Sequence, residues 1–151
     1  QSAENTFISS TFWTERIGPT AALKTLEVME REKSWVTITQ TGRLISEKWG
    51  NLANKYELDI LTWGLPALKG FSFASDNALA YKTLLTQEML KKGYLASNSI
   101  YVSTEHKSEI VDDYFEALEP IFLLIKECEE GRHINSLLSG PVCHAGFQRL
   151  N

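Results

Sequence analysis

The sequence has few cysteines, no long hydrophobic run and no large excess of charge of either sign. Its only two cysteines are Cys128 and Cys143. Two are too few for a disulfide scaffold and fit a reducing cytoplasm, with a bridge between them as the less favoured alternative. The longest apolar segment, 121–125, is far shorter than the roughly 20 residues of a membrane-spanning helix. We therefore expect a soluble, cytoplasmic protein without membrane contact.

The charge balance argues against nucleic acid as a partner. The 151 residues include 15 basic and 19 acidic side chains, well mixed along the chain, for a net charge of −4. Such a balance provides no basic patch that would attract a phosphate backbone or an anionic membrane. With 43% hydrophobic and 23% charged residues, the chain suffices for one globular core and is not expected to be disordered.

Familiar catalytic and metal-binding motifs are also missing. The only clustered ligands are Cys128, His133, Cys143 and His144, and they lack the paired spacing of structural zinc sites. We find no P-loop, dinucleotide glycine motif or Ser/His/Asp set. The sequence therefore predicts neither a metal site nor a catalytic site of these classes.

The first residues carry no targeting signal. The segment 1–5 has no initiator methionine, no basic region and no apolar stretch. We expect from this start that the chain is a piece of a longer protein.

The periodicity of apolar residues alternates between helical and strand patterns, which is typical of a mixed domain. After an extended segment 1–14, we expect helices at 15–32 (starting nearer Ile17 because of Pro19), 34–56, 77–92 and 108–130. Strands are expected at 58–63, 70–75, 94–96 and 100–102, and the tail after 131 is expected to be irregular. This order indicates an α+β fold, a small and mostly antiparallel sheet with helices packed on one face.

Several positions carry specific structural expectations. Ser34 is a possible N-cap, Gly93 closes the third helix, and Pro120 should kink or split the last one. Trp49 and Trp63 are assigned to the core, and Trp35 to an interface or a pocket wall. Tyr81, Leu84, Leu85 and Met89 are expected to form the buried side of the third helix. In the other three helices the apolar residues that share one face are Ile17, Ala21 and Val28; Ile38, Ile45, Trp49, Leu52 and Tyr56; and Ile110, Tyr114, Leu118, Ile121 and Ile125.

Three ordered stretches resemble a known family. They are 9–12 followed by 19–26, then 71–93, and finally the Ser/Thr-rich, His-containing segment 102–110. Together they resemble the C-terminal small domain of class-III (fold type I) pyridoxal-phosphate aminotransferases, in particular the glutamate-1-semialdehyde aminomutase branch. The resemblance implies an interdomain, phosphate-loop segment at 1–14, the aminotransferase domain at 15–131 and a C-terminal tail at 132–151.

The resemblance implies a role for the hydroxyl groups near the start of the chain. The family's threonine at the position of Thr11 contacts the phosphate of pyridoxal 5'-phosphate in the neighbouring subunit, so a homodimer is expected. Ser9 and Ser10 stand where the family has glycines and are further candidate donors. From the residues alone, the favoured interpretation is that these hydroxyls only cap the following helix.

The sequence departs from the family directly afterwards. Trp13, Thr14, Glu15 and Arg16 occupy the places of a small residue and Gly-Asn-Pro. Trp13, Glu15 and Arg16 are therefore candidate pocket-wall residues, although Glu15 and Arg16 could instead form surface ion pairs. The implied substrate is a small amino-acid or amino-sugar-like molecule, and the choice between transamination and amino-group shift stays open.

No catalytic residue is expected in this chain. The family's cofactor-linking lysine lies upstream of the segment that matches Thr11, and none of the ten lysines here matches it. Lys24, Lys91 and Lys92 are expected on solvent faces, and Lys69 in a loop. The chain is therefore interpreted as an inactive fragment of an enzyme. The alternative is a non-catalytic interaction or regulatory module that retains the small-domain fold.

Overall fold

The computed structural model describes residues 15–146. These residues divide into two compact units, 15–34 and 35–146. The first unit contains α1 (Ile17–Glu32), which starts at Ile17 as expected. It ends at Lys33, whose φ of 48° lies in the left-handed region. The apolar face expected on α1 is not buried, and Ile17 is 74% exposed. Among the described residues of its own unit, 15–34, α1 has no sheet or second helix to pack against.

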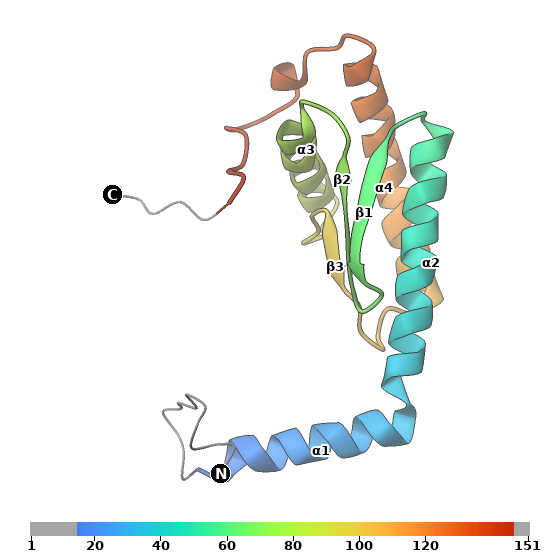
Figure 1. Ribbon diagram of the computed structural model, residues 1–151. Helices are drawn as coiled ribbons and strands as arrows, with labels where there is room; N and C mark the ends of the chain where they lie inside the picture. Colours follow the sequence, from blue (N-terminus) through green and yellow to red (C-terminus); the bar gives the residue numbers. More distant parts are fainter. Residues whose placement is uncertain (1–14, 147–151) are drawn as a thin grey trace, which may run out of the picture. The chain divides into compact units, whose positions relative to one another are not determined.

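The second unit has the predicted α+β architecture (Figure 1). A three-stranded antiparallel sheet has the order β1-β2-β3. None of the helices in the described part of the chain is long and apolar enough to cross a membrane. The elements in chain order are α2 (Ser34–Lys55), β1 (Ile60–Leu65), β2 (Leu68–Phe73), α3 (Ala78–Lys91), β3 (Ser99–Tyr101), α4 (Ser108–Glu129) and the short 3-10 helix η2 (Ile134–Ser136).

Two phenylalanines of the central strand, Phe71 and Phe73, organise the core. Phe71 packs on Trp49 of α2, with 4.8 Å between ring centroids. Phe73 packs edge-on against Tyr81 of α3 at 5.6 Å and against Phe122 of α4 at 5.4 Å. Because Phe71 and Phe73 are two residues apart on one strand, they point to the same face. All three helices therefore cover one face of the sheet, as predicted.

The hairpin of β1 and β2 is shifted from its predicted bounds. β1 continues through Gly64 to Leu65, and Leu65 pairs with Leu68 across the turn at Pro66 and Ala67. The predicted end of this strand at residue 63 is therefore two residues too early. Gly64 has a φ of +86°, and a Cβ there would lie 2.2 Å from the carbonyl oxygen of Leu68. Glycine thus allows a tight turn where the sequence pattern indicated an end.

The predicted strand 94–96 does not form. Gly93 (φ +87°) follows α3, its N–H bonds to the carbonyl of Leu90, and the N–H of Tyr94 bonds to that of Met89 at 2.9 Å. This is the Schellman pattern of a helix end, which confirms Gly93 as the closing residue. Because the Tyr94 N–H is used by the helix, it is not available to a sheet, and regular pairing starts only at β3.

The stripes on α2 and α4 are largely as predicted. Ile45, Trp49 and Leu52 are buried on α2. On α4 the buried positions are Val111, Tyr114, Leu118, Ile121, Phe122, Ile125 and Cys128, whereas Ile110, the first residue of the predicted stripe, is 49% exposed. Steps of three and four residues from Val111 keep one face, and Ile110 lies off it.

Pro120 does not split α4, which runs through it without a break. A proline here removes one backbone hydrogen bond. The buried neighbours on either side, Leu118 and Ile121, keep the helix packed on the core. Tertiary packing therefore overrides the local preference.

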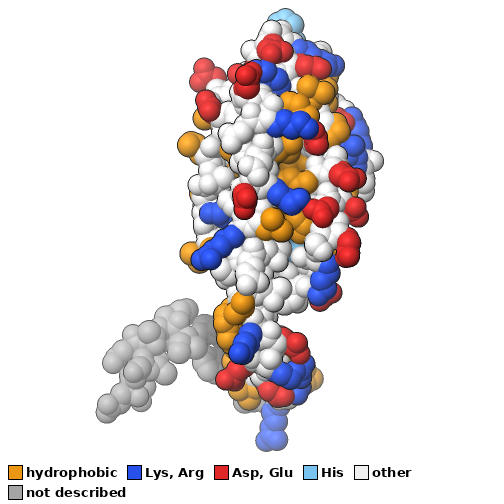
Figure 2. Space-filling view, turned by 90° about the vertical axis from the view of Figure 1, so that its right-hand side faces the viewer, with side chains coloured by type: hydrophobic (Ala, Val, Ile, Leu, Met, Phe, Trp, Pro, Cys, Tyr) orange, Lys and Arg blue, Asp and Glu red, His pale blue; other side chains and the backbone are white. Residues whose placement is uncertain are grey.

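Ion pairs connect α2 and α4 across their solvent side. Lys48 Nζ lies 2.7 Å from Asp112, and Lys55 pairs with Glu119. Figure 2 shows acidic and basic side chains interleaved with apolar ones, without a patch of one sign. Exposed pairs of this kind contribute at most about 1 kcal/mol each. Their main effect is on which helix faces pack together, and they contribute little to the free energy of unfolding.

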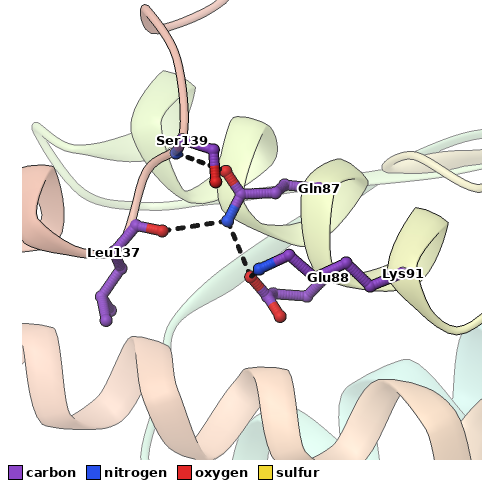
Figure 3. A network of polar contacts seen from close by, with 5 residues as sticks. All are labelled: Gln87, Glu88, Lys91, Leu137 and Ser139. Atoms are coloured by element: carbon purple, nitrogen blue, oxygen red, sulfur yellow. Dashed lines mark hydrogen bonds and ion pairs between the residues drawn. The ribbon is translucent and has the colours of Figure 1, made fainter.

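The tail after α4 is held on α3 by hydrogen bonds to Gln87 (Figure 3). The side-chain amide of Gln87 donates to the carbonyl of Leu137 at 2.9 Å and accepts from the N–H of Ser139 at 2.7 Å. Glu88 accepts from both Gln87 and Lys91. The Gln87 side chain thus bonds one backbone carbonyl and one backbone N–H of a segment that is otherwise largely irregular.

Three buried polar groups differ in how they are satisfied. The hydroxyl of Ser34, the expected N-cap, has no hydrogen-bond partner, so the capping role is wrong. The Tyr114 hydroxyl accepts from Trp49 Nε1 at 3.2 Å. The Tyr81 hydroxyl makes no hydrogen bond of standard geometry, although Glu129 is near enough to affect it. Burial is the main cause that raises the pKa of Tyr81, and likewise that of Tyr114, to about 12.

Two glycines of α2 form a matched test of helix packing. A Cβ at Gly42 would lie 1.9 Å from the Pro66 carbonyl oxygen, whereas a Cβ at Gly50 would meet nothing within 4 Å. We expect Gly42→Ala to lower the free energy of unfolding by about 1–3 kcal/mol. Gly50→Ala should raise it by about 0.5–1 kcal/mol, because alanine favours helix. Urea unfolding measures both, and equal effects would contradict the close packing of α2 on the hairpin.

The two buried phenols predict an alkaline loss of stability. A phenol with a folded pKa of about 12 and an ordinary value near 10 stays protonated in the folded state while the unfolded chain loses its proton. Stability should therefore be full below about pH 10 and fall between about pH 10 and 12. Tyr81→Phe should reduce this loss.

At pH 7 the same two positions should behave differently. Tyr81→Phe should keep or raise the free energy of unfolding, by up to about 1–3 kcal/mol, because it removes a buried hydroxyl that has no hydrogen-bond partner. Tyr114→Phe should cost about 1–3 kcal/mol, because Trp49 Nε1 loses its acceptor in the core. Urea titrations at pH 7 and 10.5 separate these effects, and equal costs at pH 7 would be inconsistent with the assigned bonds.

Candidate functional site

The predicted phosphate contacts lie outside the described residues. These are Thr11, Ser10 and Ser9, together with the pocket-wall candidate Trp13. Their assigned roles rest on the resemblance and stay predictions.

Glu15 and Arg16, the other two pocket-wall candidates, are described and exposed. Arg16 occupies the N-cap position of α1, and its carbonyl accepts from the N–H of Thr20 at 3.0 Å. Its side chain makes no capping bond. No ion pair joins either residue to another within 15–146. Within that range the alternative of surface ion pairs has no support.

The lysines of α1 and α3 lie on solvent faces, as predicted. Lys24 pairs with Glu27 at 2.7 Å, and Lys91 pairs with Glu88 at 2.6 Å. Lys69 is in strand β2 and not in a loop, and its Nζ donates to the carbonyl of Gly64 at 3.1 Å. The expected loop position was wrong because the hairpin turn is shorter than the pattern indicated.

The cysteines are both free thiols. Cys128 is buried in α4, and burial raises the pKa of its thiol. Cys143 lies beside α3, where its N–H donates to Thr83 Oγ1 at 2.9 Å. Among residues 15–146, no three Cys, His, Asp or Glu side chains are grouped to hold a metal ion.

The perturbed carboxylates belong to ion pairs on the surface. Hydrogen bonds from Lys55 and from the hydroxyl of Tyr56 lower the pKa of Glu119. A hydrogen bond from Lys126, at 2.8 Å, lowers the pKa of Glu57. Both groups stay ionised and committed to a cation, which suits a structural role and not proton transfer.

The outer face of the sheet is the most distinctive surface of the second unit. Strand register places alternate residues of the three strands on the face away from the helices. This outer face carries Leu61 (63% exposed), Trp63 (46%), Leu65 (74%), Leu68 (37%) and Tyr101 (77%). Exposed apolar residues grouped on one face are typical of a surface that binds another molecule or another part of a protein.

Trp63 was assigned to the core, and the structure corrects this. Trp63 pairs with Gly70 across the hairpin and lies over it, since a Cβ on Gly70 would come within 2.3 Å of the indole ring. The ring therefore covers a glycine on the outer face. The signal was present in the sequence, because Leu61, Trp63 and Leu65 alternate with Thr62 and Gly64.

Comparison with solved structures finds a protein with a similar fold. No family model matches the chain. The structure of the FumI protein of Sphingopyxis sp. MTA144, solved as its PLP internal aldimine form, is similar with a TM-score of 0.74 and 18% sequence identity. The similarity covers 89% of this chain and 33% of that one. The second unit and its helices thus have the α+β fold of a PLP-transferase small domain.

The sequence is also similar to part of one curated aminotransferase. The chain is 29% identical over 85 residues to 3-aminobutyryl-CoA aminotransferase of Cloacimonas acidaminovorans (strain Evry). The match covers 56% of this chain and 20% of the relative, so the chain spans a fifth of that enzyme. The resemblance to an aminotransferase C-terminal domain, inferred above from three motifs, is confirmed.

Proposed function

We propose that this chain is the C-terminal part of a PLP-dependent, class-III-type aminotransferase or aminomutase. The observation that carries the proposal is the coverage of the two matches. Nearly all of this chain corresponds to one third of a PLP-bearing protein, and over half of it to one fifth of an aminotransferase. Both matches support a module that contributes to a larger enzyme.

The proposed contribution is a contact with the cofactor phosphate. Thr11, Ser10 and Ser9 provide three hydroxyl donors, which is the chemistry that a phosphate dianion requires. The start of α1 follows six residues after Thr11, and its first turn contains no acidic residue. The unpaired N–H groups at such a helix start favour an anion nearby. The donor set therefore fits the phosphate of PLP.

In the intact enzyme, PLP would supply the electron sink of the reaction. The residues of this chain would bind and orient its phosphate, and by the resemblance they would do so across the interface of a homodimer. Trp13, Glu15 and Arg16 would form part of the pocket wall for a small amino-acid or amino-sugar-like substrate. The cofactor-linking lysine would come from an upstream domain, so the isolated chain is inactive under this proposal.

The phosphate contact can be tested in the longer protein that contains these 151 residues. Thr11→Ala should weaken PLP binding about tenfold, because a hydrogen bond to a charged group is lost. Thr25→Ala is the control, since the Thr25 hydroxyl only bonds to the carbonyl of Ala21 on exposed α1. Equilibrium titration of the apoprotein with PLP, followed by absorbance, measures both. Equal affinities for the two variants would exclude the contact.

A second experiment on the same longer protein tests whether another part of that protein covers the outer face of the sheet. Trp63 and Tyr101 should be oxidised readily by hydroxyl radicals in the isolated 151-residue chain, because both are exposed. In the longer protein they should be protected several-fold. Leu95, 97% exposed and away from that face, should react in both forms, and buried Trp49 in neither.

The alternative is a non-catalytic interaction module that keeps the small-domain fold. The exposed apolar outer face is the observation that favours it, since a separate partner could cover the same surface. Three results together would favour the interaction module over the enzyme fragment. The 151-residue chain would have to be the entire protein, it would have to bind no PLP, and a separate partner in the cell would have to protect Trp63 from oxidation. Protection within one polypeptide that binds PLP excludes the interaction module.

A further inference from the structure

A second feature of the molecule, independent of the proposed function, is a pocket between α2, the segment 94–100 and the start of α4. It has a volume of about 150 Å³. Most of its lining is apolar: Ile45, Tyr94, Leu95, Ala96, Ile100, Ile110, Val111 and Tyr114, with Ser97, Ser99 and His106 as the polar members. A cavity of this size in an apolar environment accepts a molecule of about six heavy atoms, such as benzene.

The inner wall of the pocket is rigid and its mouth is open. Ile45, Val111 and Tyr114 are buried, whereas Leu95 and Ile110 are 97% and 49% exposed. The Tyr114 ring is held by the hydrogen bond from Trp49 and by an edge-on contact with Tyr94 at 6.3 Å. A ligand could therefore enter past Leu95 and Ile110 without unfolding the core.

His106 is the one lining residue with an imidazole ring, and its Nδ1 is already bonded. Its Nδ1 accepts from the backbone N–H of Ser103 at 2.8 Å, so in the neutral ring the proton resides on Nε2. Within 15–146, no group accepts a hydrogen bond from that Nε2–H. No Asp, Glu, Lys or Arg lines the pocket. The site thus presents a donor, apolar walls and no full charge of opposite sign to an ammonium.

We propose that this pocket binds a short branched acyl compound. The apolar body of four to five carbons fills the space against Ile45 and Val111, and the carbonyl oxygen accepts from His106 Nε2. The shared chemistry is the acyl oxygen, which an amide or a carboxylate could supply. Cationic amines of the same shape are disfavoured, because no carboxylate lines the pocket to pair with an ammonium, which would lose hydration in a largely apolar cavity.

The proposal is tested by NMR titration of the 151-residue chain with 3-methylbutanamide. Saturable shifts of the methyl groups of Ile45, Ile110 and Val111 are expected, with a Kd of about 1–10 mM for a ligand of this size. The isosteric 3-methylbutylammonium should cause none. Titration with 3-methylbutanoate then shows whether a neutral or a charged acyl oxygen is preferred.

Substitutions locate the site without disturbing the fold. Ile110→Trp should abolish binding by filling the mouth, and Ile110 is exposed enough to accept a larger ring. Leu90→Trp, at a similarly exposed position on α3 outside the pocket lining, is the matched control and should bind as the parent does. His106→Ala should weaken binding about 3- to 10-fold, and His106→Gln, which keeps an N–H donor, should restore part of it.

Three results would overturn the inference: no saturable shift with either acyl probe, shifts that persist in Ile110→Trp, or equal binding of the ammonium control. Because none of these measurements involves PLP or a second domain, they leave the proposed enzyme fragment unaffected.

Discussion

The packing of Phe71 and Phe73 against three helices is the contact on which the second unit depends. Each ring meets a partner from a different part of the chain: Trp49 of α2, Tyr81 of α3 and Phe122 of α4. Burying an aromatic side chain of this size contributes about 1.5–3 kcal/mol. Since α2, α3 and α4 are separated in sequence, the central strand is what brings them to one core.

The burial of one face of the sheet determines the character of the other. A strand presents alternate residues to opposite sides, so once Phe71 and Phe73 face the helices, Trp63 and its neighbours must face outward. In an independent small domain we would expect polar residues there. Leucine, tryptophan and tyrosine occupy these positions instead, and we propose that this face is buried against another part of a larger protein. The comparisons, in which this chain spans a fifth to a third of its relatives, point the same way.

Predictions from the sequence were correct where an apolar pattern repeats over many residues. They were wrong where a single residue determines the local backbone conformation. Four helices were placed within about two residues, because stripes such as Ile45, Trp49 and Leu52 extend over several turns. The strand at 94–96 failed because the helix end uses the N–H of Tyr94. The pocket that contains His106 could not be predicted from the sequence, because its lining combines Ile45 with residues between 94 and 114, which are distant from it in the chain.

The sequence by itself determined the α+β class, the helix positions and the resemblance to aminotransferases, because these depend on local periodicity and on ordered motifs. Only the tertiary structure decided which face of the hairpin is buried, that Gly42 and Gly70 lie under Pro66 and Trp63, and which residues form the pocket. The physical reason is that strand parity and close contact depend on register between segments distant in sequence. A shift of one residue would exchange core and surface.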